Sequence, residues 1–178
     1  MPCMIEVQSI GIAPAATVHL RLVQRVAPPA VAAVPAVLGA EELPWLGDRV
    51  HDASATAELA RGLRRFQADL GLPAGPGASR PVFRKAAYVD LGRPVQLPGG
   101  WHVEIGWRAA SLAPLFPVFG GQLTITGDSI VLEGEYAPPG GDIGVAVDRA
   151  LLNIAARKTA VWLLRVIADA LDDPATAD

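Results

Sequence analysis

The titratable side chains that lie closest together in the sequence fall on predicted strands. His102, Glu104 and Arg108 share one face of a strand, and Glu133 and Glu135 lie two residues apart on another. Two carboxylates can act as acid and base in glycoside hydrolysis, and a histidine beside a carboxylate can transfer protons. Both groups alternate with apolar residues, however, which is typical of the solvated face of a half-buried strand. We therefore find no convergent catalytic set and assign no catalytic residue.

The remaining reactive residue types are isolated. Cys3 is the only cysteine, which excludes an internal disulfide and a cysteine metal cluster. His51 and Asp52 are far in sequence from the other histidines, without the spacing of metal ligands. No serine stands in a G-x-S-x-G context, and no glycine-rich phosphate loop is present. The sequence predicts neither a metal site nor a cofactor.

Large aromatic side chains are the stronger candidates for a site. Tyr88, Trp107 and Tyr136 each lie on a predicted strand and combine an apolar body with a polar group, as pocket residues often do. The other residues that we assign to ligand binding are Trp45, Phe119 and Trp162. If these rings line a cavity, its ligand is an apolar small molecule. The alternative is that they only fill a packed core.

Composition limits the class of protein. The chain has 178 residues, of which 51% are hydrophobic and 19% charged, with a net charge of −3. This length suits one domain over 1–178 with one sizeable core, and we expect a flexible tail from about residue 172. The acidic balance argues against a nucleic-acid partner. The N-terminus lacks the regions of a secretory signal, and the apolar, proline-containing stretch 27–38 is too short to span a membrane. We therefore expect a cytoplasmic protein.

The first predicted secondary-structure elements along the chain are short. Period-two alternation predicts a strand over 17–26, and a further strand is expected over 5–12. The stretch 30–38 predicts short helical turns broken at Pro35, because proline removes a helical hydrogen bond. The segment 41–47 is predicted to be a loop with an apolar cluster.

A second helix is predicted from Ser54 to Leu70. Ser54 can cap its N-terminus, and the apolar residues that follow at helical spacing are Leu59, Leu63, Phe66 and Leu70. Arg61, Arg64 and Arg65 fall on the other face, which we interpret as solvated. The segment Gly71 to Pro81 is predicted to be a flexible connection.

From Val82 onward the pattern predicts consecutive strands separated by turns. One strand ends before Gly92-Arg93-Pro94, and the next runs from Trp101 to Ala110. Two further strands flank the turn at Gly127-Asp128. No helix interrupts this run, so the sheet should be antiparallel, with consecutive strands as neighbours.

The last predicted element is a long helix from Ile143 to about Leu171. Its apolar stripe consists of Leu152, Ala155, Ala156, Thr159, Leu163, Val166, Ile167 and Ala170. At ~1.5 Å per residue the helix would be about 40 Å long. Small residues in the middle of the stripe suit a helix that lies across a concave sheet.

The order of these elements resembles the START-like or SRPBCC superfamily, also called helix-grip or polyketide cyclase-like proteins. The stretches that carry the resemblance run from Gly92-Arg93-Pro94 through Trp107 and Leu115-Phe116-Pro117, and from Gly134-Glu135-Tyr136-Ala137-Pro138-Pro139-Gly140 into Asp148-Arg149-Ala150-Leu151-Leu152. They look like an actinobacterial subgroup of bacterial members. The resemblance covers roughly residues 82–171. It implies an α+β helix-grip fold: a curved antiparallel sheet around a long C-terminal helix, with additional short helices in the first half.

The resemblance also implies a range of functions, since superfamily members bind lipids, sterols, polyketides, hormones or quinones. We expect a carrier or sensor of a hydrophobic small molecule such as a lipid or polyketide-like ligand, bound between the sheet and the C-terminal helix. One alternative is an aromatase/cyclase-like enzyme in which a buried Arg84 or Tyr88 polarises a carbonyl. Another is a protein-interaction module.

The long helix also has a second, shorter apolar patch made of Ile154, Val161 and Leu164. A solvated helix face seldom holds three branched aliphatic residues so close together. The patch is expected to be covered either by the predicted helix from Ser54 to Leu70 or by a second copy of the chain. The second arrangement predicts a two-fold homodimer.

Overall fold

The fold was analysed in a computed structural model that describes residues 17–27, 30–50, 62–73, 81–110, 118–137 and 148–173. The strand expected over 5–12 and the Ser54 cap lie outside these ranges. So do the Leu115-Phe116-Pro117 loop and the first residues of the predicted C-terminal helix.

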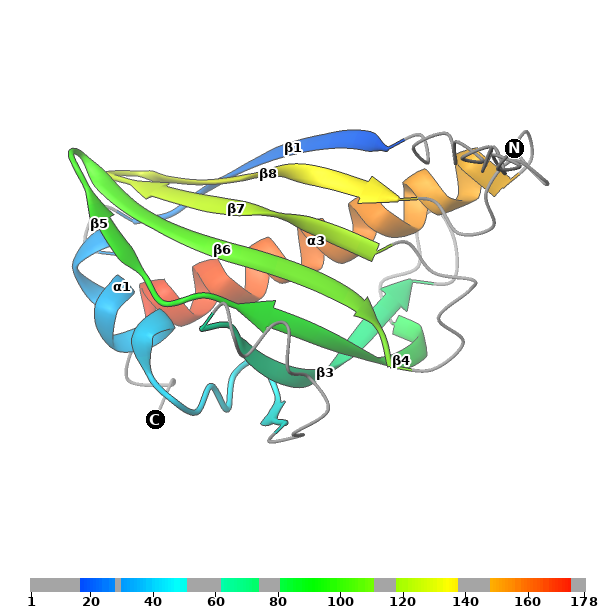
Figure 1. The fold of residues 1–178 in the computed structure, drawn as a ribbon, viewed down its shortest axis with the longest axis horizontal. Helices are drawn as coiled ribbons and strands as arrows, with labels where there is room; N and C mark the ends of the chain where they lie inside the picture. Colours follow the sequence, from blue (N-terminus) through cyan, green and yellow to red (C-terminus); the bar gives the residue numbers. More distant parts are fainter. Residues whose placement is uncertain are drawn as a thin grey trace, which may run out of the picture.

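The described chain forms an eight-stranded antiparallel sheet (Figure 1). Its strands are β1 (Val18–Arg25), β2 (Asp48–Arg49), β3 (Arg64–Pro73), β4 (Pro81–Leu91), β5 (Val95–Leu97), β6 (Gly100–Ala109), β7 (Val118–Thr126) and β8 (Ser129–Ala137). The strand order is β1-β8-β7-β6-β4-β3-β2, and β5 pairs with β6. Consecutive strands β6, β7 and β8 are neighbours, as predicted, and β1 returns to pair with β8 along its whole length.

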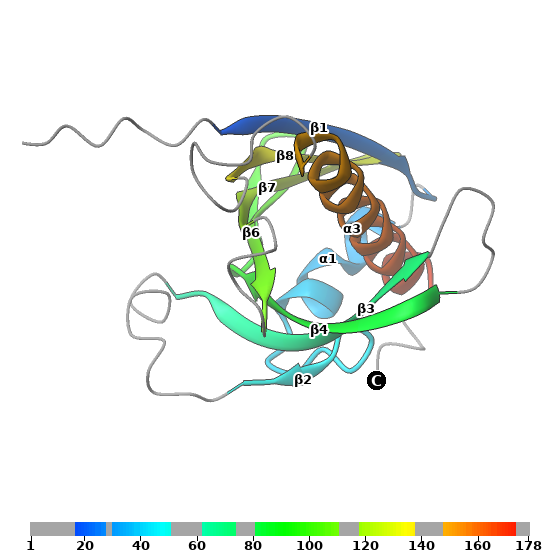
Figure 2. The same ribbon diagram turned by 90° about the vertical axis from the view of Figure 1, so that its right-hand side faces the viewer.

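Two helices pack inside the curve of this sheet. The long helix α3 (Asp148–Asp172) runs through the concavity, and the sheet bends around it (Figure 2). The shorter helix α1 (Ala30–Gly39) lies beside the C-terminal part of α3 (Figure 1). This arrangement confirms the predicted α+β helix-grip architecture. Within the described ranges, no helix is both long and apolar enough to cross a membrane.

Alternation along the strands decides which side chains face α3. On β6, Val103, Ile105 and Trp107 are buried, whereas Glu104 between them is exposed. The same alternation holds on β7 and β8, because successive strand residues point to opposite faces. We call the face toward α3 the inner face and the other the outer face. The inner face and the buried stripe of α3, which includes Leu163 and Ile167, form one hydrophobic core.

The predicted helix from Ser54 to Leu70 is wrong from residue 64 onward, because Arg64–Pro73 forms β3 and pairs with β4. Phe66 and Ala68 are buried while Gln67 and Asp69 are exposed, which is a period-two pattern. The helical spacing of the apolar residues was therefore coincidental, and pairing with a distant strand overrode it. The predicted connection also begins later, since β3 includes Gly71 and β4 begins at Pro81.

Two smaller expectations also fail. Arg64 and Arg65 are buried, with exposed fractions of 3% and 9%, so they do not form a solvated face. Helix α1 continues through Pro35 instead of breaking there. Proline at this point removes one helical hydrogen bond. Burial of Val34, Val37 and Leu38 against the core offsets that loss.

Candidate functional site

Three of the six predicted ligand-binding residues lie side by side on the inner face. Trp107 on β6 is directly opposite Phe119 on β7, and Phe119 is directly opposite Tyr136 on β8. We call these three residues the aromatic row. All three are buried. Val18 of β1 continues the row beyond Tyr136, and Val89 and Phe66 continue it beyond Trp107.

The rings of Trp107 and Phe119 are stacked, with centroids 3.8 Å apart and planes inclined by 12°. The two rings therefore contact each other face to face. This contact links β6 and β7 on the inner face, and it covers the ring faces that the two side chains turn toward each other.

The part of the inner face between the aromatic row and the β5–β6 hairpin is aliphatic. Its facing positions on four neighbouring strands are Leu22, Leu132, Leu123 and Val103. These pack in one core with α1 and the last turns of α3. Trp107 lies near the other end of β6, away from α1 (Figure 1). The aromatic row therefore lies farther from α1 than these aliphatic residues do.

Tyr136 adds a polar group to the aromatic row. Burial raises the pKa of its hydroxyl, and the positive charge of Arg157 on α3 acts in the opposite direction. The phenol is therefore neutral near pH 7 and can donate a hydrogen bond. Arg157 itself is exposed, whereas its neighbour Ala156 is buried against the core.

The other three predicted site residues, Trp45, Trp162 and Tyr88, lie outside the aromatic row. Trp45, in the loop after α1, and Trp162, on α3, are half-buried and pack against the same core. Tyr88 is not brought together with the aromatic row. It lies on the outer face, where the guanidinium groups of Arg65 and Arg108 lie 5.6 and 6.0 Å from its ring centroid. The alternation of Ala87, Val89 and Leu91 was a signal in the sequence that could have placed Tyr88 there.

The polar residues of β6 and β8 occupy the outer face, as predicted. His102, Glu104 and Glu133 line an open hollow of about 980 Å³, together with His19, Gln122, Glu135 and Arg93. His19 Nε2 lies 3.4 Å from Glu133 Oε1, and both side chains are about half exposed. Among the described residues, no three histidine, cysteine or acidic side chains are grouped as a metal site. The structure does not describe the side chain of Arg84, which was a candidate for polarising a ligand carbonyl.

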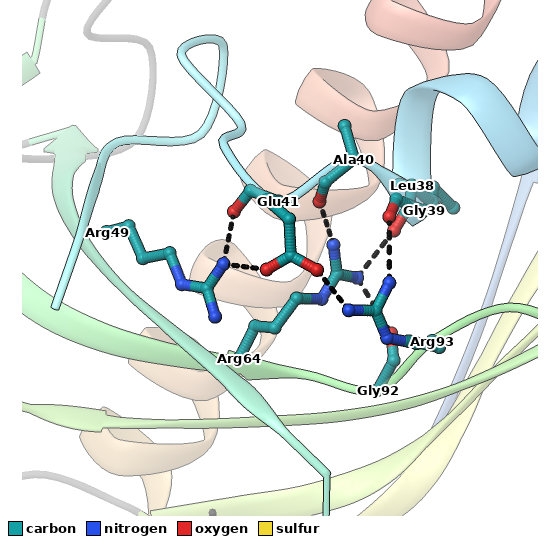
Figure 3. Close-up of polar contacts among 8 residues, drawn as sticks. All are labelled: Leu38, Gly39, Ala40, Glu41, Arg49, Arg64, Gly92 and Arg93. Atoms are coloured by element: carbon teal, nitrogen blue, oxygen red, sulfur yellow. Dashed lines mark hydrogen bonds and ion pairs between the residues drawn. The ribbon is translucent and has the colours of Figure 1, made fainter. Parts of the chain in front are cut away.

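Two buried arginines have roles that the sequence pattern missed. Arg65 forms a bidentate ion pair with Asp90, with Nε–Oδ1 and Nη2–Oδ2 distances of 2.7 and 3.0 Å. Arg64 donates hydrogen bonds to the backbone carbonyls of Leu38, Ala40 and Gly92 (Figure 3). Two of these carbonyls lie at the C-terminus of α1, where helical partners are lacking.

Glu41 lies beside Arg64 and accepts hydrogen bonds from Arg49 and Arg93 (Figure 3). These two bonds hold the pKa of Glu41 at about 2. Burial lowers the pKa of Arg64, and the charge of Arg93 lowers it further. No local sequence motif predicts this cluster of Glu41, Arg49, Arg64 and Arg93. The fold brings its members together from the α1–β2 loop, β2, β3 and the β4–β5 turn.

Other parts of the same chain bury some of the apolar patch that was predicted on the long helix. Leu164 is buried, Val161 is half-buried, and the side chain of Ile154 lies outside the description. Helix α1 and strand β1 both pack on α3, and residues 64–70 of the segment that was expected to cover the patch as a helix belong to β3. The homodimer stays a prediction.

No family model matches the sequence, and no curated protein matches it. Solved structures with a similar fold include the Zhui aromatase/cyclase from Streptomyces sp. R1128, with a TM-score of 0.50 and 18% identity over 89% of this chain and 95% of that one. They also include BexL, a di-domain aromatase/cyclase from the BE-7585A biosynthetic pathway, with a TM-score of 0.52 and 17% identity. That match covers 90% of this chain and half of BexL. At these identities the likeness concerns the fold. The chain therefore shares a helix-grip fold with these two aromatase/cyclases.

Proposed function

We propose that this protein binds a hydrophobic small molecule, such as a lipid or a polyketide-like compound, between the inner face of the sheet and α3. The observation that carries this proposal is the aromatic row. Trp107, Phe119 and Tyr136 are buried side by side across three strands of the inner face. Ligand pockets combine apolar and aromatic side chains with a few polar groups that orient the ligand.

The polar group in this proposal is the Tyr136 hydroxyl. It is neutral near pH 7, so it can donate a hydrogen bond to a carbonyl or hydroxyl oxygen of the ligand. In this proposal the opposing side of the site is the middle of α3. Its residues Ala156, Thr159 and Ala160 are small and are buried in the structure. Small residues on the helix leave more space above the aromatic row than leucine or phenylalanine would.

The test is a binding titration with a solvatochromic naphthalene probe. We expect saturation at one probe per chain, and about tenfold weaker binding by the Trp107→Ala and Tyr136→Ala variants, which corresponds to ~1.4 kcal/mol. Trp101→Ala is the matched control, because Trp101 lies at the β5–β6 hairpin, beyond the aliphatic part of the inner face. Circular dichroism must show that each variant is folded.

Two results would contradict ligand binding at the aromatic row. One is the absence of saturable binding of the naphthalene probe to the wild-type chain. The other is an equal loss of affinity in all three variants, which would mean that the rings only stabilise a packed core.

A second candidate function is an aromatase/cyclase-like reaction at the same site. The neutral Tyr136 phenol beside the positive charge of Arg157 favours it, because a hydrogen-bond donor near a cation can polarise a carbonyl oxygen. The structures of similar fold are named aromatase/cyclases. Incubation with a synthetic poly-β-ketone separates the two functions. An enzyme would form one aromatic product, with loss of water, faster than the buffer alone does, and Tyr136→Phe would abolish that excess. A carrier would not accelerate formation of any one product over the uncatalysed reaction.

A further inference from the structure

Three arginine side chains lie beside one glutamate at the C-terminal end of α1. Figure 3 shows the guanidinium groups of Arg49, Arg64 and Arg93 next to the carboxylate of Glu41. Glu41 Oε2 accepts a hydrogen bond from Arg49 and Oε1 accepts one from Arg93, whereas Arg64 donates to backbone carbonyls. We call these four residues the arginine cluster. Both oxygens of its carboxylate are thus used by two of its three arginines.

The arginine cluster has an excess of positive charge, because three guanidinium groups stand beside one carboxylate. Glu42 and Asp48, which are near the cluster in sequence, are exposed and form no ion pair with it in the described part of the chain. The C-terminus of α1 offsets the excess only in part, since a helix end carries roughly half an elementary charge. Besides burial, the charges of Arg93 and Arg49 lower the pKa of Arg64, and Glu41 opposes them.

Backbone carbonyls hold the three guanidinium groups independently of the Glu41 carboxylate. Arg64 is bonded to three such carbonyls. Arg49 Nη1 lies 3.0 Å from the backbone oxygen of Glu41, and Arg93 Nη1 lies 3.4 Å from that of Gly39, which is a looser contact. The side chain of Glu41 is 53% exposed, so its carboxylate can turn toward solvent while the arginines stay in place. The cluster is therefore preorganised around a position that an external anion can reach.

One donor of the arginine cluster has no acceptor. Arg64 is 3% exposed, and among the described residues its Nε is the only buried side-chain nitrogen or oxygen without a hydrogen-bond partner. An unpaired buried donor is costly and calls for an explanation. The two oxygens of Glu41 are already bonded to Arg49 and Arg93. A phosphoryl group has three acceptor oxygens, which matches the number of guanidinium groups.

We propose that the arginine cluster binds the phosphoryl group of a phosphate monoester, which displaces the Glu41 carboxylate from between Arg49 and Arg93. These two arginines donate to two phosphoryl oxygens, and Arg64 Nε donates to the third. The planar fork of arginine suits such oxygens, and a dianion balances the excess charge while Glu41 stays nearby. This site goes beyond the ligand binding proposed at the aromatic row and does not depend on it.

Isothermal titration calorimetry with glycerol 3-phosphate, at constant ionic strength, tests the site. At about pH 7.5 this monoester is a dianion, because its second pKa is about 6. Acetate is the comparison ligand, since it has the single charge and the two oxygens of the Glu41 carboxylate. We expect saturation at one glycerol 3-phosphate per chain, with binding of acetate at least about tenfold weaker.

Two variants should change the affinity for glycerol 3-phosphate in opposite directions. Glu41→Gln removes the internal competitor and should tighten binding about tenfold, whereas Arg93→Gln removes a donor and should weaken it about tenfold. A merely structural role of Glu41 would lower stability without raising this affinity. The matched controls are Asp128→Asn and Arg25→Gln, which make the same charge changes in an exposed ion pair outside the cluster. They should change the affinity less than about twofold.

A lipid head group and a soluble metabolite can both carry a phosphate monoester. Co-sedimentation with phosphatidylcholine vesicles that contain phosphatidic acid, but not with pure phosphatidylcholine vesicles, would assign the phosphoryl group to a lipid. Binding of glycerol 3-phosphate without co-sedimentation would assign it to a soluble compound.

Three outcomes would overturn the inference. The first is the absence of saturable glycerol 3-phosphate binding to a Glu41→Gln variant that circular dichroism shows to be folded. The second is an equal change of affinity in Asp128→Asn and Glu41→Gln, because net charge rather than the arginine cluster would then govern binding. The third is acetate binding as tight as that of glycerol 3-phosphate, which would refute the assignment to a phosphoryl group.

Discussion

Replacement of Arg64 by methionine should destabilise the fold strongly, although the sequence pattern suggests an exposed arginine. The guanidinium is buried and donates to three backbone carbonyls, at 2.5 Å for Leu38 and 3.0 Å for Gly92, with the third on Ala40. Its Nε has no hydrogen-bond partner among the described residues, so the three carbonyl contacts account for most of what the side chain contributes.

The magnitude follows from the groups that lose their partner. A buried carbonyl left without a hydrogen bond costs about 1–3 kcal/mol. The variant no longer has to desolvate a guanidinium, which offsets part of the loss. We therefore expect a net loss of about 3 kcal/mol in the free energy of unfolding. For a chain of this length that corresponds to a decrease in Tm of about 6–12 °C.

Urea unfolding followed by tryptophan fluorescence measures this loss. The matched control is Arg93→Met, which removes the same charge from the same cluster. Arg93 is 61% exposed and contacts Glu41 and, at 3.4 Å, the carbonyl of Gly39, so its loss should cost no more than about 1 kcal/mol. An equal loss of stability in the two variants would refute the reasoning, because burial of the carbonyl contacts would then not matter. A changed denaturant slope would show that a substitution altered the compactness of the native or denatured state, or the two-state transition, so that the free energies of the two variants could not be compared.

Two further predictions concern pH. The pKa of Glu41 is lowered from 4.5 to about 2, so its contribution to stability should be fully present above pH 4.5 and should be lost as the pH falls toward 2. The difference in Tm between the wild type and Glu41→Gln should therefore shrink as the pH falls from 4.5 to 2. Glu42→Gln is the control, because Glu42 is an exposed glutamate next to Glu41. A difference in Tm that does not shrink by pH 2 would contradict the role of Arg49 and Arg93. Burial raises the pKa of Tyr136, so in a Tyr88→Phe variant the remaining phenol should ionise above pH 10 by ultraviolet absorbance, and stability should fall as the pH rises through that transition. Ionisation at or below pH 10 would show that the Tyr136 hydroxyl is solvated.

Local pattern was sufficient for the parts of this protein in which each strand or helix has one buried and one exposed face. The alternation of Val103, Ile105 and Trp107 with polar residues predicted both the strand and the orientation of its side chains. The apolar stripe of the last helix predicted burial of Thr159, Leu163 and Ile167 in the same way. These features follow from the periods of strands and helices, which depend only on neighbours in the chain.

Other features were decided by tertiary structure, because they depend on residues far apart in sequence. Strand β3 forms where the apolar spacing favoured a helix, since ten of its residues pair with β4. Arg64 and Arg65 are buried because their partners, the α1 carbonyls and Asp90, are brought to them by the fold. The aromatic row exists only because the register of three strands places Trp107, Phe119 and Tyr136 opposite one another. Residue types identified these rings as candidates, but only strand register determined that they lie side by side.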